Sequence, residues 1–237
     1  MKKKMLVLLA SCVLAVSMTA CGGSDSKKET AAASAKEGQT VEEKDVKEEK
    51  EVKKEKDAEE SKPDAGVWNG NDYTNEFAGI TFHMPEDWVA ATDEELLSTM
   101  DLGSEYTSLD EKAYEKALKG TYCPMGASAV SGTNLFLMFE NLKETAMFSA
   151  NMTESQYLQA LKSQLSAGVS GLQYTIVTED GETELSGQKY HYLEATTSTQ
   201  GMTITQYYVV RKIDHYMCAF IITSMDQTLE DITALFS

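Results

Sequence analysis

Two stretches of the chain, residues 135–139 (LFLMF) and 216–222 (YMCAFII), are apolar without any alternation. A strand with one solvated face alternates apolar and polar residues, so an unbroken apolar run is typical of a strand that is buried on both faces. A sheet with such strands at its centre needs a covering layer on each side. The two runs therefore restrict the fold to a sheet held between two layers.

Short turn signals separate the other expected strands. Residues 79–85 alternate up to Pro85, which should end that strand, and Trp88 is expected in the turn that follows. Further runs lie at 172–180, 188–196 and 202–212, and turns are expected at Asp180-Gly181, Ser186-Gly187, Gln200-Gly201 and around Asp214. Connections this short join antiparallel neighbours, because parallel strands need a long crossover.

Helices with recognisable starts supply the covering layers. Thr153 and Gln156 have the spacing of a capping box, and an apolar stripe follows until Gly168 ends the helix. Similar pairs are Thr92 with Glu95, Ser108 with Glu111 (before Gly120), and Ser224 with Gln227. We therefore expect an α/β (α+β) fold, an α/β/α sandwich in which helices flank a central antiparallel sheet of about six strands.

The beginning of the chain resembles a lipoprotein signal. Three lysines, residues 2–4, precede an apolar run that is too short for a permanent membrane span, and Ala20-Cys21 follows like a lipobox. Cys21 is thus expected to carry the lipid anchor, because two acyl chains hold a protein to a membrane where one does not. An ordinary secretory signal with an incidental cysteine and a membrane-spanning anchor are the alternatives.

Composition changes abruptly after Cys21. Residues 22–66 hold 10 lysines and 14 acidic residues with only isolated valines, as in VEEKDVKEEKEVKKEKDAEE. Such a segment cannot bury enough apolar surface to offset its chain entropy, so we expect a solvated tether. The expected organisation is a signal peptide over 1–20, a lipidated Cys21 with a disordered tether over 21–66, and one globular domain over 67–237.

The expected domain is strongly acidic, with 8 Lys and Arg against 24 Asp and Glu, a net charge of −16. A nucleic-acid backbone would be repelled, because its binding depends on contacts with cations. Nucleic acid is therefore excluded as a partner. A protein or ligand with a basic surface is expected instead, and the lipid must supply attachment to the membrane.

Several segments together resemble a known family. Tyr73-Thr74-Asn75, residues 79–82, and Pro85 with Trp88 resemble the opening hairpin of PsbP-like proteins. GQKYHYLEA and QYYVVRKIDHYMCAFIITS, with the helix after them, resemble the closing half of that fold. The resemblance covers roughly residues 70 to 236 and implies the sandwich described above. It also implies an accessory or binding role of the kind known in photosystem assembly, and a type found in lipid-anchored proteins of Gram-positive bacteria.

No catalytic, cofactor or metal motif is recognisable. The three histidines, His83, His191 and His215, show no zinc-site spacing, and HExxH, paired CxxC, GxSxG, glycine-rich phosphate loops and EF-hand loops are missing. Each histidine is expected as an exposed or hydrogen-bonded ring in or beside a strand. A metal site assembled from distant strands stays open.

Two residue types invite a functional interpretation. Carboxylates suitable for a glycosidase pair occur at Glu140, Glu144, Asp180 and Glu182, but we expect them mostly at solvated turns. Tyrosines suitable for a ligand groove occur at 190, 192, 207, 208 and 216, and packing on the sheet is the favoured interpretation.

Cys123 and Cys218 permit one disulfide, although a free, buried Cys218 is the preferred expectation.

These observations favour a lipid-anchored extracytoplasmic accessory or binding protein that is not an enzyme and needs no cofactor. The expected location is the outer face of the cytoplasmic membrane of a Gram-positive bacterium. An envelope hydrolase with an unrecognised site is the alternative from another class. A lipoprotein that binds a small ligand for a transporter is a third hypothesis.

Overall fold

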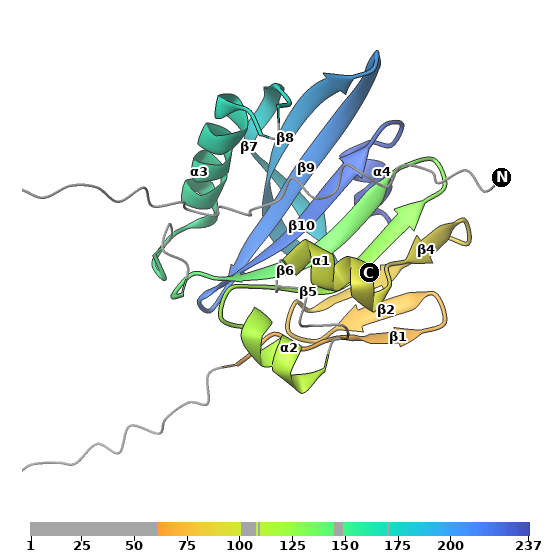
Figure 1. Cartoon of the computed structure of the whole chain (residues 1–237), viewed down its shortest axis with the longest axis vertical. Coiled ribbons are helices and arrows are strands. Elements are labelled where there is room, and N and C mark those ends of the chain that lie inside the picture. The colour runs from red at the N-terminus through yellow and green to blue at the C-terminus, as the bar shows by residue number, and fades with distance from the viewer. Residues whose placement is uncertain (1–60, 101–107, 109, 145–148, 170) are drawn as a thin grey trace, which may run out of the picture. The chain divides into compact units, whose positions relative to one another are not determined.

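The chain forms an α+β fold around a seven-stranded antiparallel sheet (Figure 1). This computed structural model describes residues 61–100, 108, 110–144, 149–169 and 171–237. The sheet order is β4-β5-β6-β10-β9-β8-β7. The strands are β4 Trp88–Ala90, β5 Thr121–Ala129, β6 Asn134–Asn141, β7 Tyr174–Leu185, β8 Gln188–Thr199, β9 Met202–Ile213 and β10 Tyr216–Ser224. The expected α/β/α architecture is confirmed, with seven strands where about six were expected.

β10 lies at the centre of this sheet, between β6 and β9. Cys218 pairs with Phe139 of β6 on one side and with Arg211 of β9 on the other. Every residue of β10 is buried, and so are nearly all residues of β6. The two unbroken apolar runs are therefore strands covered on both faces, as their pattern predicts.

Two tight hairpins form where the sequence predicts them. Ser186 and Gly187 join β7 to β8 with φ of 49° and 71°, and Gln200 and Gly201 join β8 to β9 with 52° and 80°. Positive φ at both central residues matches the right-handed twist of the flanking strands. The turn expected at Asp180-Gly181 is wrong, because β7 runs on through it with shifts of register. A register shift of this kind disturbs the pairing of β7 with β8 locally but does not end the strand.

The two faces of the sheet have different covers. On one face lies α3 (Glu154–Ala167), which begins with the Thr153–Gln156 capping box, ends at Gly168 and buries Tyr157, Leu158, Leu161 and Leu165. Tyr157 donates to Glu140 of β6 at 2.8 Å. The neighbouring Phe139 points to the opposite face, where its ring meets Phe77.

That opposite face is covered by a small three-stranded sheet and the end of the chain. The small sheet consists of β1 Val67–Asn69, β2 Asp72–Asn75 and β3 Ile80–His83. Phe82 of β3 packs against Phe236, and Phe236 packs against Phe220 of β10. Phe236 lies in the C-terminal segment, shortly after α4 (Leu229–Thr233). Buried side chains therefore pack against both faces of the large sheet.

Three local expectations need correction. Trp88 is buried as expected, but it begins the edge strand β4 instead of standing in a turn. α2 (Glu111–Ala117) is capped by Asp110 and not by Ser108, since Asp110 accepts from the amides of Lys112 and Ala113. α4 is capped by Thr228 with Asp231, four residues after the position expected from Ser224 and Gln227. The pair Thr92 and Glu95 does cap α1 (Asp93–Met100).

The folded unit begins before the expected boundary at Val67. Asp64 accepts hydrogen bonds from the amides of Gly66 at 2.6 Å and Phe77 at 2.8 Å. Tyr114 donates to the carbonyl of Pro63 at 2.7 Å, and Tyr73 donates to that of Ala65 at 3.0 Å. The division between tether and domain at residues 66 and 67 is therefore placed too late.

The remaining N-terminal expectations lie outside the described residues. These are the signal peptide over 1–20, the lipidated Cys21 and the tether up to residue 60. Within the part of the chain that the structure describes, no helix is long and apolar enough to cross a membrane.

Candidate functional site

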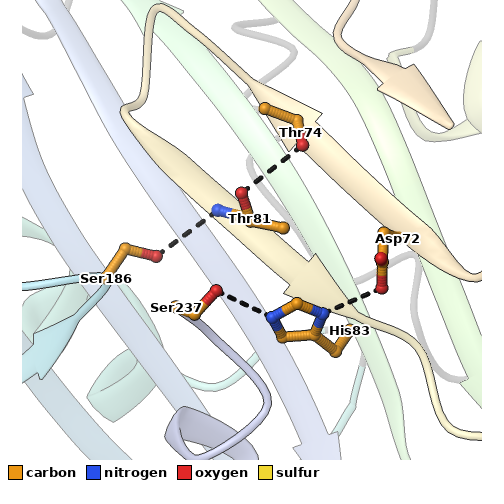
Figure 2. A network of polar contacts seen from close by, with 6 residues as sticks. All are labelled: Asp72, Thr74, Thr81, His83, Ser186 and Ser237. Atoms are coloured by element: carbon orange, nitrogen blue, oxygen red, sulfur yellow. Dashed lines mark hydrogen bonds and ion pairs between the residues drawn. The ribbon is translucent and has the colours of Figure 1, made fainter. Parts of the chain in front are cut away.

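A carboxylate, an imidazole and a hydroxyl line up on the outer face of the small sheet (Figure 2). Asp72 and His83 are opposite each other in the pairing of β2 with β3. The Nδ1 atom of His83 lies 2.8 Å from Oδ1 of Asp72, and its Nε2 atom lies 2.7 Å from Oγ of Ser237. The order is Asp, His, Ser, with the imidazole between two oxygens.

Backbone pairing holds Ser237 at the edge of β3. The amide of Ser237 donates to the carbonyl of Thr81 at 3.0 Å, and the amide of Thr81 donates to the carbonyl of Ser237 at 3.2 Å. The amide of His83 donates to the carbonyl of Leu235 at 2.8 Å. Phe236, between them, is buried in the core. The Ser237 hydroxyl is thus placed by main-chain bonds and by an anchored neighbour.

Further hydroxyls surround this group. Ser186, in the β7–β8 turn, accepts the amide hydrogen of Thr81 at 3.4 Å. The hydroxyl of Thr81 lies 3.4 Å from that of Thr74 across the β2–β3 pair. Ser186 and Ser237 therefore contact the same amide, and Figure 2 shows them on one side of β3. We call Asp72, His83, Ser186 and Ser237 the β3 cluster.

The chemistry open to the β3 cluster follows from its geometry. With the proton of a neutral imidazole on Nδ1, His83 donates to Asp72 and accepts from the Ser237 hydroxyl. Both contacts fall within the distance at which a base can remove a proton. The side chains of His83 and Asp72 are 47% and 52% exposed, so solvent and solutes reach the group.

His191 forms a second pair with a carboxylate. Its Nδ1 atom lies 2.7 Å from Oδ1 of Asp180. Desolvation opposes ionisation of Asp180, but hydrogen bonds from Ser155 and His191 outweigh it and hold the pKa of Asp180 below its usual value. His215 is buried in the β9–β10 turn against the ring of Tyr216. The three histidines therefore lie in or beside strands, as expected from the sequence.

The structure does not bring the four nominal carboxylates into a common site. Glu140 is buried in β6 at 5% exposure and accepts from Tyr157, so the expectation of a solvated turn is wrong for it. Glu144 is exposed, Asp180 faces His191, and Glu182 pairs with Lys189 at 2.6 Å on β7 and β8. Desolvation of the buried phenol raises the pKa of Tyr157 well above its usual value, and the charge of Glu140 and the hydrogen bond to it add to the rise.

The tyrosines belong mainly to the packed sheet. Tyr190, Tyr207, Tyr208 and Tyr216 are buried, and Tyr192 is half-buried. Tyr190 packs on Phe220 on one face, whereas Tyr208 donates to Gln206. Packing on the sheet, the favoured interpretation, describes these side chains.

Cys123 and Cys218 are not joined in the structure, and both thiols are buried. Cys123 donates to the carbonyl of Met125 at 3.7 Å. Burial raises the pKa of each thiol to about 12. Among the described residues, no three His, Cys, Asp or Glu side chains gather in a way that would hold a metal ion.

Sequence reasoning missed Asp72 and Ser237 as members of a site. The expected opening hairpin could have pointed to Asp72, because its register places residue 72 opposite residue 83. No spacing signal links Ser237 to His83, since they are 154 residues apart and meet only through the fold.

Comparisons with known proteins found solved structures with a similar fold. No family model matches the chain, and no curated protein matches it. The chain is similar to the solution structure of cyanobacterial PsbP (CyanoP) from Synechocystis sp. PCC 6803, at 12% identity and a TM-score of 0.43, over 73% of this chain and 97% of that chain. It is also similar to LpqN, involved in cell envelope biogenesis of Mycobacterium tuberculosis, at 14% identity and a TM-score of 0.35, over 66% of this chain and 76% of that chain. The expected resemblance to PsbP-like proteins thus recurs among solved structures.

Proposed function

We propose that this chain is a lipid-anchored extracytoplasmic accessory protein that works mainly by binding a partner. The observation that carries the proposal is the order of residues at the start of the sequence. A basic group at residues 2–4, a short apolar run and Ala20-Cys21 have the arrangement of a lipoprotein signal. In a Gram-positive bacterium such a protein is held at the outer face of the cytoplasmic membrane.

The charge of the domain supports a partner of opposite sign. Residues 67–237 carry a net charge of −16, a sum that already includes paired charges such as Lys162 of α3 with Glu179 of β7. A field of this size speeds association with a basic protein or ligand and disfavours anionic surfaces. Attachment to one membrane would also raise the local concentration of the domain near other membrane-held proteins, so that a weak interface suffices.

Replacement of Cys21 tests the anchor. A Cys21→Ser variant should leave the membrane fraction or accumulate as precursor, whereas the native chain should sediment with membranes and carry the mass of two acyl chains. Cys12→Ser is the matched control, because residue 12 lies in the apolar part of the same signal and should not affect anchoring. Retention of an unlipidated Cys21→Ser protein in the membrane would contradict the proposal.

The binding role needs a separate experiment. The native chain, solubilised in detergent, should capture a membrane or envelope protein with a basic surface, and association should slow as salt rises because long-range steering is screened. Binding that is insensitive to salt would contradict the electrostatic part of the proposal. A small-ligand-binding role would instead give a soluble, low-molecular-weight ligand on denaturation of the purified protein.

A further inference from the structure

Three members of the β3 cluster stand in the order that activates a hydroxyl. Asp72, His83 and Ser237 come from β2, β3 and the segment after α4, and two contacts of 2.8 and 2.7 Å join them. We propose that Ser237 is a nucleophile for small acyl esters, with His83 as its base and Asp72 as the residue that orients the imidazole. This activity goes beyond the proposed binding role.

The reaction can be written with its bonds balanced. The Ser237 oxygen attacks the carbonyl carbon of the ester while its proton passes to Nε2 of His83. The bond from that carbon to the alcohol oxygen then breaks, and His83 returns the proton to the departing alcohol. Water attacks the acyl-serine in the second half, again giving a proton to His83, and releases the carboxylic acid with the Ser237 hydroxyl restored.

The fold supplies the positioning that such a step requires. Ser237 is fixed by two backbone bonds to Thr81 and by the buried ring of Phe236, so its hydroxyl stays within reach of the imidazole. Ser186 accepts the amide hydrogen of Thr81 and has its own hydroxyl proton to donate. That proton is suited to the oxygen of the carbonyl, which becomes negative during attack.

Exposure of the β3 cluster determines the substrate class. His83 and Asp72 are about half exposed on the outer face of β2 and β3, and Ser237 is exposed beside them. Esters with a small acyl group and a good leaving group reach such a surface directly from solvent. We therefore infer small activated acyl esters as substrates, not long-chain lipids that need a deep apolar cleft.

The pair of His191 with Asp180 provides a control within the same chain. Its distance of 2.7 Å matches that of His83 with Asp72, and among the described residues no hydroxyl is bonded to Nε2 of His191. If an exposed imidazole beside a carboxylate were sufficient for ester cleavage, both pairs would contribute. If the serine is the nucleophile, only the β3 cluster will.

Cleavage of p-nitrophenyl acetate by the full chain, purified in detergent, tests the proposal. Ser237→Ala and His83→Ala should each lower the rate above the buffer background at least about tenfold. His191→Ala should leave it unchanged. Urea denaturation must show that each variant is folded, because His83 also ties β2, β3 and Ser237 together. Equal rates for native protein and Ser237→Ala would overturn the proposal, and so would a loss seen only in His191→Ala.

Covalent labelling identifies the nucleophile independently of rate. A fluorophosphonate probe should bind the Ser237 oxygen through phosphorus, with fluoride as the leaving group and the proton taken by His83. Mass spectrometry should place the adduct on the peptide that contains Ser237, and His83→Ala should reduce labelling. An adduct on another serine, or none on the folded native chain, would reject Ser237 as the nucleophile.

Discussion

The guanidinium group of Arg211 lies over the ring of Tyr190, with Cζ 5.2 Å from the ring centroid. The same group donates to the carbonyl of Ala78 at 2.6 Å and to Oε1 of Gln188 at 2.8 Å. Arg211 belongs to β9 of the large sheet, whereas Ala78 lies in the turn between β2 and β3. One side chain therefore fastens the small sheet to the large one.

Arg211→Ala should lower the free energy of unfolding by about 2 to 3 kcal/mol, because it removes a charged hydrogen bond and a cation–ring contact. Arg211→Lys should recover only part of this loss, since an ammonium group cannot contact the ring and two acceptors in the same way. Gln188→Ala is the matched control and should cost about 0.5 kcal/mol, because its bond is exposed. Urea denaturation measures all three; equal losses for Gln188→Ala and Arg211→Ala would contradict this role.

Asp64 should fasten the start of the folded unit. Its carboxylate accepts from the amides of Gly66 and Phe77 and from the side chain of Asn75 at 3.2 Å. In Asp64→Ala these amides lose their acceptor, so hydrogen exchange at Gly66 and Phe77 should speed up about tenfold while the centre of β10 stays protected. Glu76→Ala, at an exposed neighbour, should change neither; unaltered exchange in Asp64→Ala would show that the carboxylate does not hold this segment.

The sheet could be predicted from the sequence because its signals are local. Unbroken apolar runs identify doubly covered strands, and Ser186-Gly187 and Gln200-Gly201 favour the positive φ that tight hairpins need. Asp180-Gly181 carries the same signal and yet lies inside β7, because the pairing of β7 with β8 continues on both sides of it. A dipeptide such as Asp-Gly shows that the backbone can form a turn at that position. Whether the turn forms depends on the long-range pairing of the strands.

The candidate site could not be predicted in the same way. Asp72 and His83 are joined by a hairpin register, which a sequence argument can reach, but Ser237 reaches β3 only after Phe236 has docked in the core. The burial of Glu140 could not be predicted from the sequence for a related reason. Its burial depends on α3 placing the Tyr157 hydroxyl 2.8 Å away, and no pattern around residue 140 reveals that partner.

Gly181 should tolerate no side chain while Tyr192 is present. A Cβ atom at residue 181 would lie 2.3 Å from Cε1 of Tyr192, which pairs with it across β7 and β8. Gly181→Ala should therefore destabilise the protein by about 1 to 3 kcal/mol through overpacking. Gly120→Ala, with nothing within 4 Å and no positive φ, is the matched control and should be nearly neutral.

A double variant separates overpacking from backbone effects at this position. In Tyr192→Ala the ring is gone, so adding Gly181→Ala should cost about 0.5 kcal/mol or less. Chemical denaturation of the four members of the cycle measures the coupling. An equal cost of Gly181→Ala with and without the Tyr192 ring would mean that the backbone, and not the ring, requires glycine here.

The buried thiols should make the fold sensitive to alkali. Burial raises the pKa of Cys123 and Cys218 from 9.0 to about 12. Well below pH 9 both thiols are protonated in the folded and the unfolded chain, so they do not alter stability with pH. Above pH 9 the unfolded chain loses these protons first and binds fewer than the folded chain, so the free energy of unfolding falls as pH rises towards 12.

The expected loss from the two thiols is about 2 kcal/mol between pH 9 and 10, because each contributes roughly 1 kcal/mol over that interval. Buried phenols add to it, since desolvation also raises the pKa of Tyr73, Tyr122 and Tyr190. Urea denaturation at pH 8, 9 and 10 should therefore show a steep decline for the native sequence and about half that decline for the double variant Cys123→Ala, Cys218→Ala. Identical slopes for the two proteins would mean that the thiols titrate alike in both states. Rapid alkylation of the folded native chain at pH 8 would contradict their burial directly, because the thiolate must meet the reagent for the reaction to occur.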